Sequence, residues 1–456
     1  MFIRLILMVM TVWALTGCQS QSETKEAAGP ATASTGPQKD SAPAESESPS
    51  SAPAIRVVEL PQDVLGLWRQ LPPETELLFF SQSPMLAPVH PQLQKRANAL
   101  ATSEETAQHR GETRFFAPDP SLLATNTVRI ALETGIFGGV TWIFPSQTET
   151  ENLSLEVFKK QLSESGMLTP EEVASLRFNN GVLKGQVAGK PFIAEPLSLL
   201  DTVRQPALLH IDLSYLAAQY RNDVQTPAYG LIHDLASRLR PLLKDLRATT
   251  LSLSTEEGEV PLGMRFMGQR LAELLETPRM LDSDPPTNWR LHADILYRNS
   301  LMQTDYPLDA YLNLLNTHPE DAAATYGLYQ AYRAVKLGDK ALDTLDRAVR
   351  LDSGYAYEYL LLSEIAYEAG ELQSARKMLE LARPYFASHY FIDYFNAQLL
   401  LEQGNNDRAR ELLAQMKAHS WSSVHHAEIP DLLQEFEQKL MVQDSINLLR
   451  SFSETQ

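Results

Sequence analysis

A histidine and an aspartate two residues apart are the first residues of this sequence that could do chemistry. His210 and Asp212 lie near the end of the apolar run 207–213, which has the composition of a buried strand. Side chains at alternate strand positions point to the same side, so the imidazole and the carboxylate could form a base–acid pair or part of a ligand set. The simpler interpretation, which we favour, is a half-buried histidine that is hydrogen-bonded near the strand end.

Clusters of acids and histidines elsewhere are weaker candidates. Glu256, Glu257 and Glu259 could act as general acids, but three acids in one loop usually form a solvated turn. His425 and His426 are adjacent, so on a helix their rings would face different ways and would not share a metal ion. The stretch GIFGGV lacks the spacing and the lysine of a phosphate-binding loop, and no G-x-S-x-G motif is present. We therefore assign no catalytic residue, no metal ligand and no cofactor.

The single cysteine of the chain, Cys18, ends a segment with the features of a secretion signal. Arg4 supplies a positive charge, and the apolar run 5–15 is shorter than the ~20 residues of a membrane span. The sequence LTGC that follows resembles the lipobox of bacterial lipoproteins, which implies removal of residues 1–17 and lipidation of Cys18. The alternative is an ordinary signal peptide with an incidental cysteine. Gln19, where an aspartate would favour the inner membrane, leans toward the outer membrane.

Residues 18–54 form a predicted disordered tether between this anchor and the folded part. From residue 19 onward they contain no Leu, Ile, Val, Met or aromatic residue, so the segment cannot bury enough apolar surface to offset the cost of ordering. A flexible chain of this length has an r.m.s. reach of roughly 30–36 Å. The tether would therefore lift the folded part clear of the lipid head groups.

The elements that must position these residues are strands and helices in alternation. The apolar runs 77–80, 140–144, 207–213 and 249–253 read as buried strands. Amphipathic stretches predict helices over 127–134, 231–246 and 262–275. Gly135 would cap the first of these helices, and Pro241 would kink or split the second. Strands alternating with helices predict an α/β domain over 55–285, with a mostly parallel sheet and helices on both faces. Sites in such sheets lie at the carboxyl ends of the strands.

Three segments of this domain resemble an uncharacterised branch of the arginase/deacetylase-like fold. They are GVTWIFP, LLHIDLSYL and LSLSTEEGEVPLGMRFMGQRLAELL. The resemblance implies a parallel α/β sandwich, whose active members bind divalent metal through Asp-x-His after one strand and Asp-x-Asp after a later one. These motifs fall on residues 81–83 (Ser-Gln-Ser) and 212–214 (Asp-Leu-Ser), so only Asp212 is kept. The resemblance therefore implies a fold whose metal site has been lost.

The last third of the chain repeats itself every 34 residues. The matching columns are Ala341, Ala375 and Ala409; Leu345, Leu379 and Leu413; Ala348 and Ala382; and Gly370 and Gly404. A fixed period of 34 with small residues at set places indicates helix–turn–helix repeats, which bury their apolar faces only by stacking. The units are 288–321, 322–355, 356–389 and 390–423. Pro307 replaces an alanine in the first, and Gly338 lies two residues late in the second, which predicts a shifted first helix there.

The stretches GDKALDTLDRAVRLD and GELQSARKMLELA resemble tetratricopeptide repeats, with a glycine that closes helix A and alanines seven apart in helix B. The resemblance implies an all-α solenoid over 286–423, followed by a capping helix and tail over 424–456. Apolar positions of that helix are Leu432, Leu433, Phe436, Leu440 and Met441.

In tetratricopeptide arrays the second, fifth, ninth and twelfth residues of helix A line a concave groove. The residues that this implies for partner binding are Tyr326, Arg333, Tyr357, Leu360, Glu364, Tyr367, Tyr394 and Gln398. Tyrosines among amides and carboxylates suit the capture of a protein segment by stacking and hydrogen bonds. The alternative is that these aromatic side chains pack between helices.

The charge balance limits the class of partner. The chain has 57 acidic and 39 basic residues, a net charge of −18, which opposes nucleic acid or anionic lipid as the main partner. We therefore expect a lipid-anchored cell-envelope protein, at the outer membrane facing the periplasm, whose repeats recruit another protein beside a non-catalytic α/β domain. The alternative is an envelope metal-dependent hydrolase of arginase/deacetylase-like fold that acts on a small amide or acyl substrate and uses the repeats for docking.

Overall fold

The apolar runs of the first half of the chain pair into one eight-stranded sheet. This computed structural model describes residues 55–103, 109–146, 155–200, 207–222, 226–301, 303, 308–386 and 388–454. The four predicted strands are confirmed as β2 (Glu76–Phe80), β3 (Gly139–Phe144), β7 (Ala207–Asp212) and β8 (Leu246–Ser252). Cys18, the predicted signal peptide, the tether and Pro307 lie outside the described residues.

The centre of the sheet is parallel and one edge is antiparallel. The strand order is β1-β8-β7-β2-β3-β6-β5-β4, with β1 (Arg56–Val58) parallel to β8 and β6 (Lys190–Pro196) parallel to β3. Strands β4 (Arg177–Asn179) and β5 (Val182–Val187) continue from β6 as antiparallel hairpins, which the sequence analysis missed. Their two-residue turns have positive φ at both positions, the twist that tight hairpins favour; they are Asn180-Gly181 and Ala188-Gly189.

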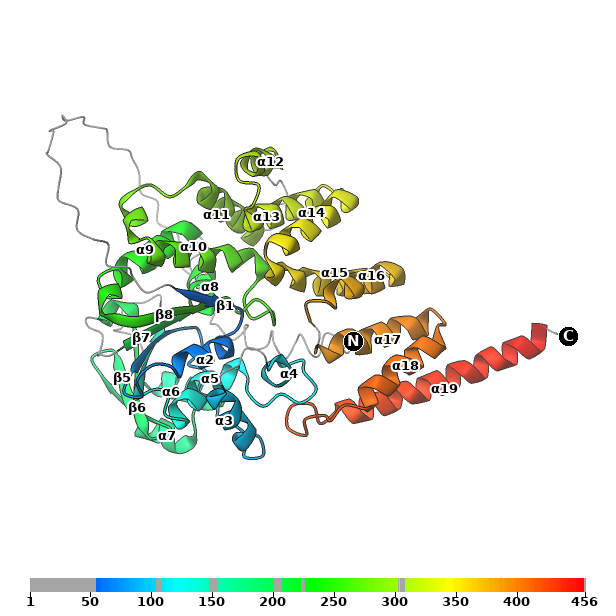
Figure 1. The fold of residues 1–456 in the computed structure, drawn as a ribbon, viewed down its shortest axis with the longest axis horizontal. Coiled ribbons are helices and arrows are strands. Elements are labelled where there is room, and N and C mark those ends of the chain that lie inside the picture. Colours follow the sequence, from blue (N-terminus) through cyan, green and yellow to red (C-terminus); the bar gives the residue numbers. More distant parts are fainter. Residues whose placement is uncertain are drawn as a thin grey trace. The chain divides into compact units, whose positions relative to one another are not determined.

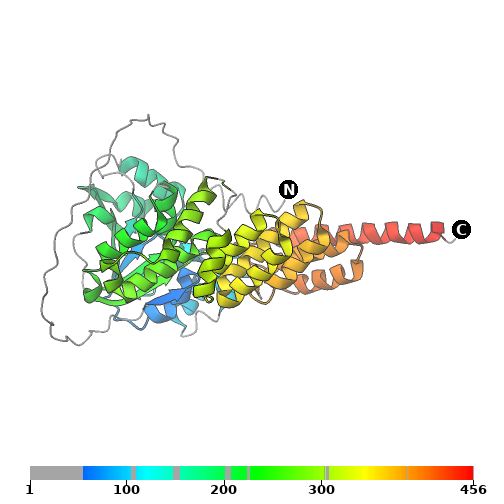
Figure 2. The same cartoon turned by 90° about the horizontal axis from the view of Figure 1, so that it is seen from above.

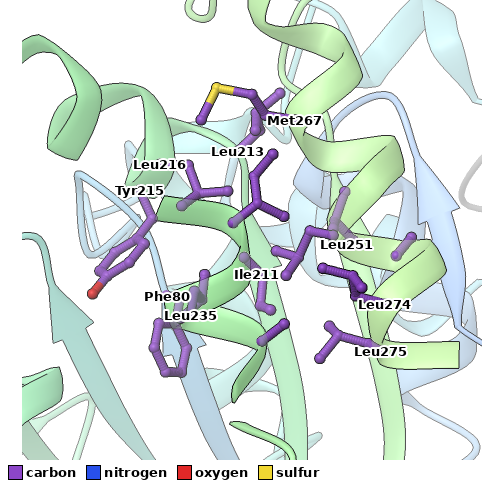
Figure 3. Packing of buried hydrophobic residues seen from close by; sticks show 14 of the residues in the cluster. Phe80, Ile211, Leu213, Tyr215, Leu216, Leu235, Leu251, Met267, Leu274 and Leu275 are labelled. Atoms are coloured by element: carbon purple, nitrogen blue, oxygen red, sulfur yellow. The ribbon is translucent and has the colours of Figure 1, made fainter. Parts of the chain in front are cut away.

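Helices cover both faces of the sheet (Figure 1). One face packs against α8 (Ser214–Asn222), α9 (Ala228–Leu239) and α10 (Arg265–Glu276), and Figure 3 shows Phe80, Ile211 and Leu251 pointing into this core. The other face buries Leu77, Phe79 and Leu208. Its helices are α2 (Leu65–Trp68), α3 (Gln94–Thr102), α5 (Thr127–Glu133), α6 (Leu155–Glu164) and α7 (Pro170–Ser175). Adjacent strand residues thus serve opposite cores, as the two-residue period of a strand requires.

Two predicted helix ends have different outcomes. Gly135 follows α5 with φ of +73°, which confirms the predicted glycine cap. The predicted helix 231–246 is too long, because α9 ends at Leu239 and Leu246 already belongs to β8. Pro241 lies just after this end, where its ring would clash with the preceding turn of a continued helix. The regular leucine spacing therefore continued from helix α9 into strand β8, although the helix does not.

The second half of the chain is a series of helix pairs (Figures 1 and 2). The pairs are α11 (Thr287–Ser300) with α12 (Leu308–Thr317), α13 (Ala322–Ala334) with α14 (Gly338–Leu351), α15 (Tyr357–Glu368) with α16 (Leu372–Ala382), and α17 (Tyr390–Glu402) with α18 (Asn406–Lys417). Helices α13, α15 and α17 end at Ala334, Glu368 and Glu402, which are 34 residues apart. The repeat read from the sequence is therefore a repeat of structure.

All three of these helices end in the same turn. Gly370 and Gly404 follow α15 and α17 with φ of +79° and +73°, and Lys336 takes the equivalent place after α13 with φ of +60°. In each turn the next amide donates to the carbonyl five residues earlier, as in Leu337 N to Tyr332 O at 2.9 Å. The predicted shift of the first helix in unit 322–355 is therefore wrong. Lys336 adopts the left-handed conformation in place of glycine, and Gly338 begins α14.

Small residues at the repeat columns let the helices approach closely. Ala375, Ala409 and Ala348 are fully buried, and so are Leu345 and Leu379. Helix α19 (Ile429–Glu454) continues the stacking against α18. It buries Ile429, Leu433, Phe436 and Leu440. Met441, which was predicted to lie on the apolar face of this helix, is 60% exposed. Among the described helices, none has both the length and the apolar character of a membrane span.

Candidate functional site

The carboxyl end of β7 carries a buried polar chain rather than an open site. Asp212 is fully buried, and its Oδ2 accepts hydrogen bonds from the hydroxyls of Ser252 and Ser254 at 2.5 Å each. Its Oδ1 accepts from the backbone N–H of Ser214 at 2.9 Å. Burial raises the pKa of Asp212, although these donors favour the carboxylate. Both carboxylate oxygens are therefore engaged by the chain itself.

His210 joins the same chain of hydrogen bonds. Its Nδ1 lies 2.8 Å from the Thr250 hydroxyl and its Nε2 lies 3.1 Å from the Ser252 hydroxyl. Since Ser252 donates to Asp212, we assign the histidine proton to Nε2, which then donates to Ser252. Thr250 in turn accepts from Trp68 Nε1 at 3.2 Å. Burial lowers the pKa of His210 to about 3, so the ring is neutral.

This geometry favours the structural interpretation of His210 and Asp212. The imidazole is fully buried, not half-buried as predicted, beside the rings of Phe79, stacked at 5.5 Å, and Trp68, edge-on at 5.1 Å. Ser252 lies between the histidine and the aspartate, whereas nucleophilic catalysis requires the histidine between the other two. Across the described residues, no three side chains of metal-ligating type lie close enough to hold an ion. His210 and Asp212 therefore act in this structure as buried, hydrogen-bonded structural residues.

The acidic loop 256–259 is not a fully solvated turn, contrary to the prediction. Glu256 forms an ion pair with buried Arg114, whose guanidinium also binds Asp63 at 2.8 Å. Glu257 Oε1 accepts the backbone N–H of Phe115 at 2.7 Å. Burial raises the pKa of Glu257 to about 7, against the opposing effects of this hydrogen bond and of Arg114. Glu259 alone keeps an exposed residue surface, yet desolvation of its carboxyl group and the nearby Asp212 carboxylate raise its pKa to about 8.

Part of the predicted groove is buried inside the array. Tyr326 is buried and its hydroxyl donates to Glu358 Oε2 at 2.8 Å, while Leu360 is buried among the helices. Tyr357 packs against the α/β region, because a Cβ on Gly258 would come within 2.8 Å of its hydroxyl oxygen. Burial raises the pKa of Tyr357 to about 12. In this arrangement these three side chains cannot contact a partner.

Arg333 is hydrogen-bonded inside the array and is also partly exposed on its surface. Its Nη1 donates to Glu358 Oε1 at 3.1 Å, which also accepts from the Tyr329 hydroxyl at 2.6 Å. This buried carboxylate thereby joins α13 to α15, a contact that the sequence analysis missed. The side chain of Arg333 is still 45% exposed, so the outer part of the guanidinium remains reachable.

The remaining predicted residues lie in a partly accessible row on α15 and α17. Glu364, Tyr367, Tyr394 and Gln398 are all half-buried. The Tyr367 hydroxyl donates to Glu402 of the next repeat at 2.8 Å, and Tyr394 is hydrogen-bonded to Gln398. The Tyr394 ring also lies 6.0 Å from Phe436 of α19. We name this row, together with Arg333, the helix-A strip.

The loops between successive repeats contact the α/β region, a feature that the sequence did not predict. Arg270 and Arg265 of α10 bind Asp321 and Asp352, which lie in the first two of these loops, at 3.1 and 2.6 Å. Further along, the backbone amides of Tyr390 and Ser422 donate to the α/β region at 3.0 Å. The contacts belong to one compact unit, residues 52–456. This edge of the array is therefore occupied, whereas the helix-A strip stays partly accessible.

Comparison with protein-family models gave no match, and comparison with curated proteins gave none either. Among solved structures, one similar chain is a tetratricopeptide repeat protein from Parabacteroides merdae. It is 15% identical, with 51% of this chain and 82% of that chain covered and a TM-score of 0.23. A similarity of this size supports no inference about function. The repeat architecture rests instead on the helix pairs and their 34-residue spacing.

Proposed function

We propose that this chain is a lipid-anchored protein of the bacterial cell envelope, at the outer membrane facing the periplasm, whose helical repeats bind another protein. The observation that carries this proposal is the helix-A strip, which stays partly accessible although the loop edge of the array is covered. Stacked repeats present such rows to partners because each repeat adds equivalent helix side chains at a fixed spacing. The net charge of −18 supports a protein partner rather than nucleic acid.

The chemistry of the strip suits a segment of another protein. Tyr367 and Tyr394 offer aromatic surface with a polar edge, and Gln398 and Glu364 offer hydrogen-bonding groups beside them. The α/β region serves in this proposal as a support that fixes the array through Asp321 and Asp352. The hydrolase alternative gains no support from the geometry, because Asp212 is enclosed by its own hydroxyl donors.

The strip can be tested with a double variant and a matched control. Tyr367→Ala with Gln398→Ala should lower recovery of a co-purifying envelope protein about tenfold or more, because truncated interface anchors commonly cost ~2 kcal/mol. Lys377→Ala with Gln415→Ala changes two exposed residues on the second helices of the same repeats and should leave recovery unchanged. Loss of the partner with the control pair, and its retention with the strip pair, would place the interaction on the other face.

The anchor is tested separately. Cys18→Ser should abolish acylation, so the protein should leave the detergent phase in a phase-partition experiment, and mass spectrometry should show no diacylglycerol on the chain. A variant that still partitions like the wild type would refute the lipobox interpretation, without bearing on the strip.

A further inference from the structure

Residues 114–118, Arg-Phe-Phe-Ala-Pro, project from the α/β region onto the end of the array. Ala117 N donates to Arg114 O at 3.1 Å, so the segment forms a tight turn. Phe116 is buried and Ala117 is fully buried. The Phe115 ring lies edge-on to Phe116 at 5.3 Å. We name residues 114–118 the aromatic turn.

The array receives the carbonyl groups of this turn with three separate donors. His426 Nε2 lies 2.8 Å from Phe115 O, Tyr390 N donates to Phe116 O at 3.0 Å, and Ser422 N donates to Pro118 O at 3.0 Å. Tyr390 is the first residue of α17, where the backbone N–H has no partner within the helix. The donors lie at the start of α17 and in the connection from α18 to α19, so the docking position exists only in the stacked array.

The Phe116 ring fits an aromatic pocket on the array. It stacks on His389 with 4.2 Å between ring centroids and an interplanar angle of 18°, and Tyr390 and Phe391 lie 6.1 and 6.3 Å away. Buried aromatic side chains in such pockets contribute most of the energy of many protein interfaces. Burial lowers the pKa of His389 to about 3, so the stacked ring is neutral. The pocket therefore suits an aromatic, uncharged side chain.

We propose that this end of the array is a second binding site, specific for aromatic turns, and that residues 114–118 occupy it in cis. The site consists of His389, Tyr390, Phe391, Ser422 and His426. Its ligand class is a peptide turn with a phenyl ring at the position of Phe116 and three carbonyls within one turn. A partner carrying such a turn would compete with the chain's own segment for the same donors. The site is distinct from the helix-A strip and does not depend on it.

The competing cis segment defines the experiment. A fluorescent peptide of residues 113–120 (TRFFAPDP) is titrated into the purified full chain and into its Phe116→Ala variant. A tethered segment competes at an effective concentration on the order of millimolar, so the variant should bind the peptide about tenfold or more tightly than the wild type. A control peptide with alanine in place of Phe116 (TRFAAPDP) should bind neither protein.

Hydrogen exchange at Tyr390 and Ser422 shows whether the pocket has opened. In Phe116→Ala these two amides should exchange faster, and the peptide should restore their protection. Adding His426→Phe to this variant should weaken the peptide about tenfold, because one charge-neutral donor to a carbonyl is lost. Phe116→Leu, which keeps apolar volume without stacking, replaces Phe116→Ala if that variant loses cooperative unfolding.

Two results would overturn the proposal. One is peptide binding that is undetectable at about 1 mM in a variant whose Tyr390 and Ser422 amides have opened. The other is protection of those amides that is unchanged without the Phe116 ring, since the ring would then not anchor the turn. The strip variant Tyr367→Ala with Gln398→Ala should bind the peptide like its parent, so failure of the proposed function and failure of this site give different results.

Discussion

At the residue scale, Glu257 joins two segments that are far apart in the sequence. Its Oε1 accepts a hydrogen bond from the Phe115 N–H at 2.7 Å, and the carbonyl oxygen of the same Phe115 lies 2.8 Å from His426 Nε2. Burial raises the pKa of Glu257 from its ordinary value of 4.5 to about 7. The folded protein therefore holds a proton on this group over a pH range in which the unfolded chain has released it.

The sign of the resulting pH dependence follows from linkage. Below about pH 4.5 both states are protonated and the group makes no difference, and as pH rises toward 7 only the unfolded state ionises, which lowers the free energy of unfolding. Glu257→Gln should remove this loss. Urea denaturation at pH 5 and pH 8 should show a smaller drop for the variant than for the wild type, by about 1–3 kcal/mol. Equal drops in both proteins would mean that Glu257 ionises normally.

The sequence predicted that His210 and Asp212 lie close together, but it could not decide between a catalytic pair and a structural hydrogen-bond network. Their two-residue spacing correctly placed both on one side of a buried strand. Their partners Thr250 and Ser252 lie on β8, about 40 residues later, and hydroxyl residues in a strand carry no signal that they will pair with a particular neighbour. The register of β7 against β8, which no local pattern encodes, decided that the histidine would be enclosed.

At the element scale, the three helix ends of the array show how one conformation is met by different residues. Gly370 and Gly404 adopt a positive φ without cost, whereas Lys336 adopts it with a Cβ. The sequence signal for this turn was glycine, so the lysine was overlooked and Gly338 was given its role. The side chain of Lys336 is exposed, so the residue is kept there by backbone geometry rather than by contacts.

Lys336→Gly should therefore stabilise the protein. Relief of the left-handed strain should outweigh the greater freedom of glycine in the unfolded chain, for a gain of about 0.5–1 kcal/mol in the free energy of unfolding. Urea denaturation measures it, with Gly370→Ala as the converse change. A Cβ at Gly370 would meet nothing within 4 Å, so its expected loss of about 1 kcal/mol would come from conformation alone. A destabilising Lys336→Gly would contradict this explanation.

Helices were predictable where the 34-residue repeat was present, and strands were predictable where an apolar run was largely unbroken. The 34-residue repeat placed every helix pair from α13 to α18, and apolar runs located four strands. The β4–β6 hairpins were missed because strands were predicted only from largely unbroken apolar runs and polar residues interrupt these three, although Asn180-Gly181 is a strong hairpin signal. The helix 231–246 was overextended because leucines of a helix, a turn and a strand happened to keep helical spacing.

At the scale of the whole molecule, the α/β region and the array are joined along the loop edge. Buried Arg265 binds Glu59 beside β1 and Asp352 of the array at 2.5 and 2.6 Å. Neither the 34-residue period nor the strand pattern predicts such pairing, because it depends on how two separately patterned regions meet. For the same reason the sequence could not show that Tyr357 would contact Gly258 instead of a partner.

Ala375→Leu tests how far stability is shared. Ala375 is fully buried in the middle of the array, so a larger side chain there should cost about 1–3 kcal/mol by overpacking. Because each repeat is coupled to its neighbours, hydrogen exchange should accelerate across α13–α18 and change little in β2, β3 and β7. Uniform acceleration in the sheet and in the array would show that the two regions unfold as one.

The most direct test of the central proposal is site-specific photocrosslinking in intact cells. A photoreactive residue is placed at Glu364 or Gln398 of the helix-A strip, or at the control positions Lys377 and Gln415 on the second helices of the same repeats. We predict one discrete protein adduct that is shared by both strip positions and absent from both control positions. An adduct formed from the control positions alone, with none from the strip, would contradict the proposal that the strip binds the partner.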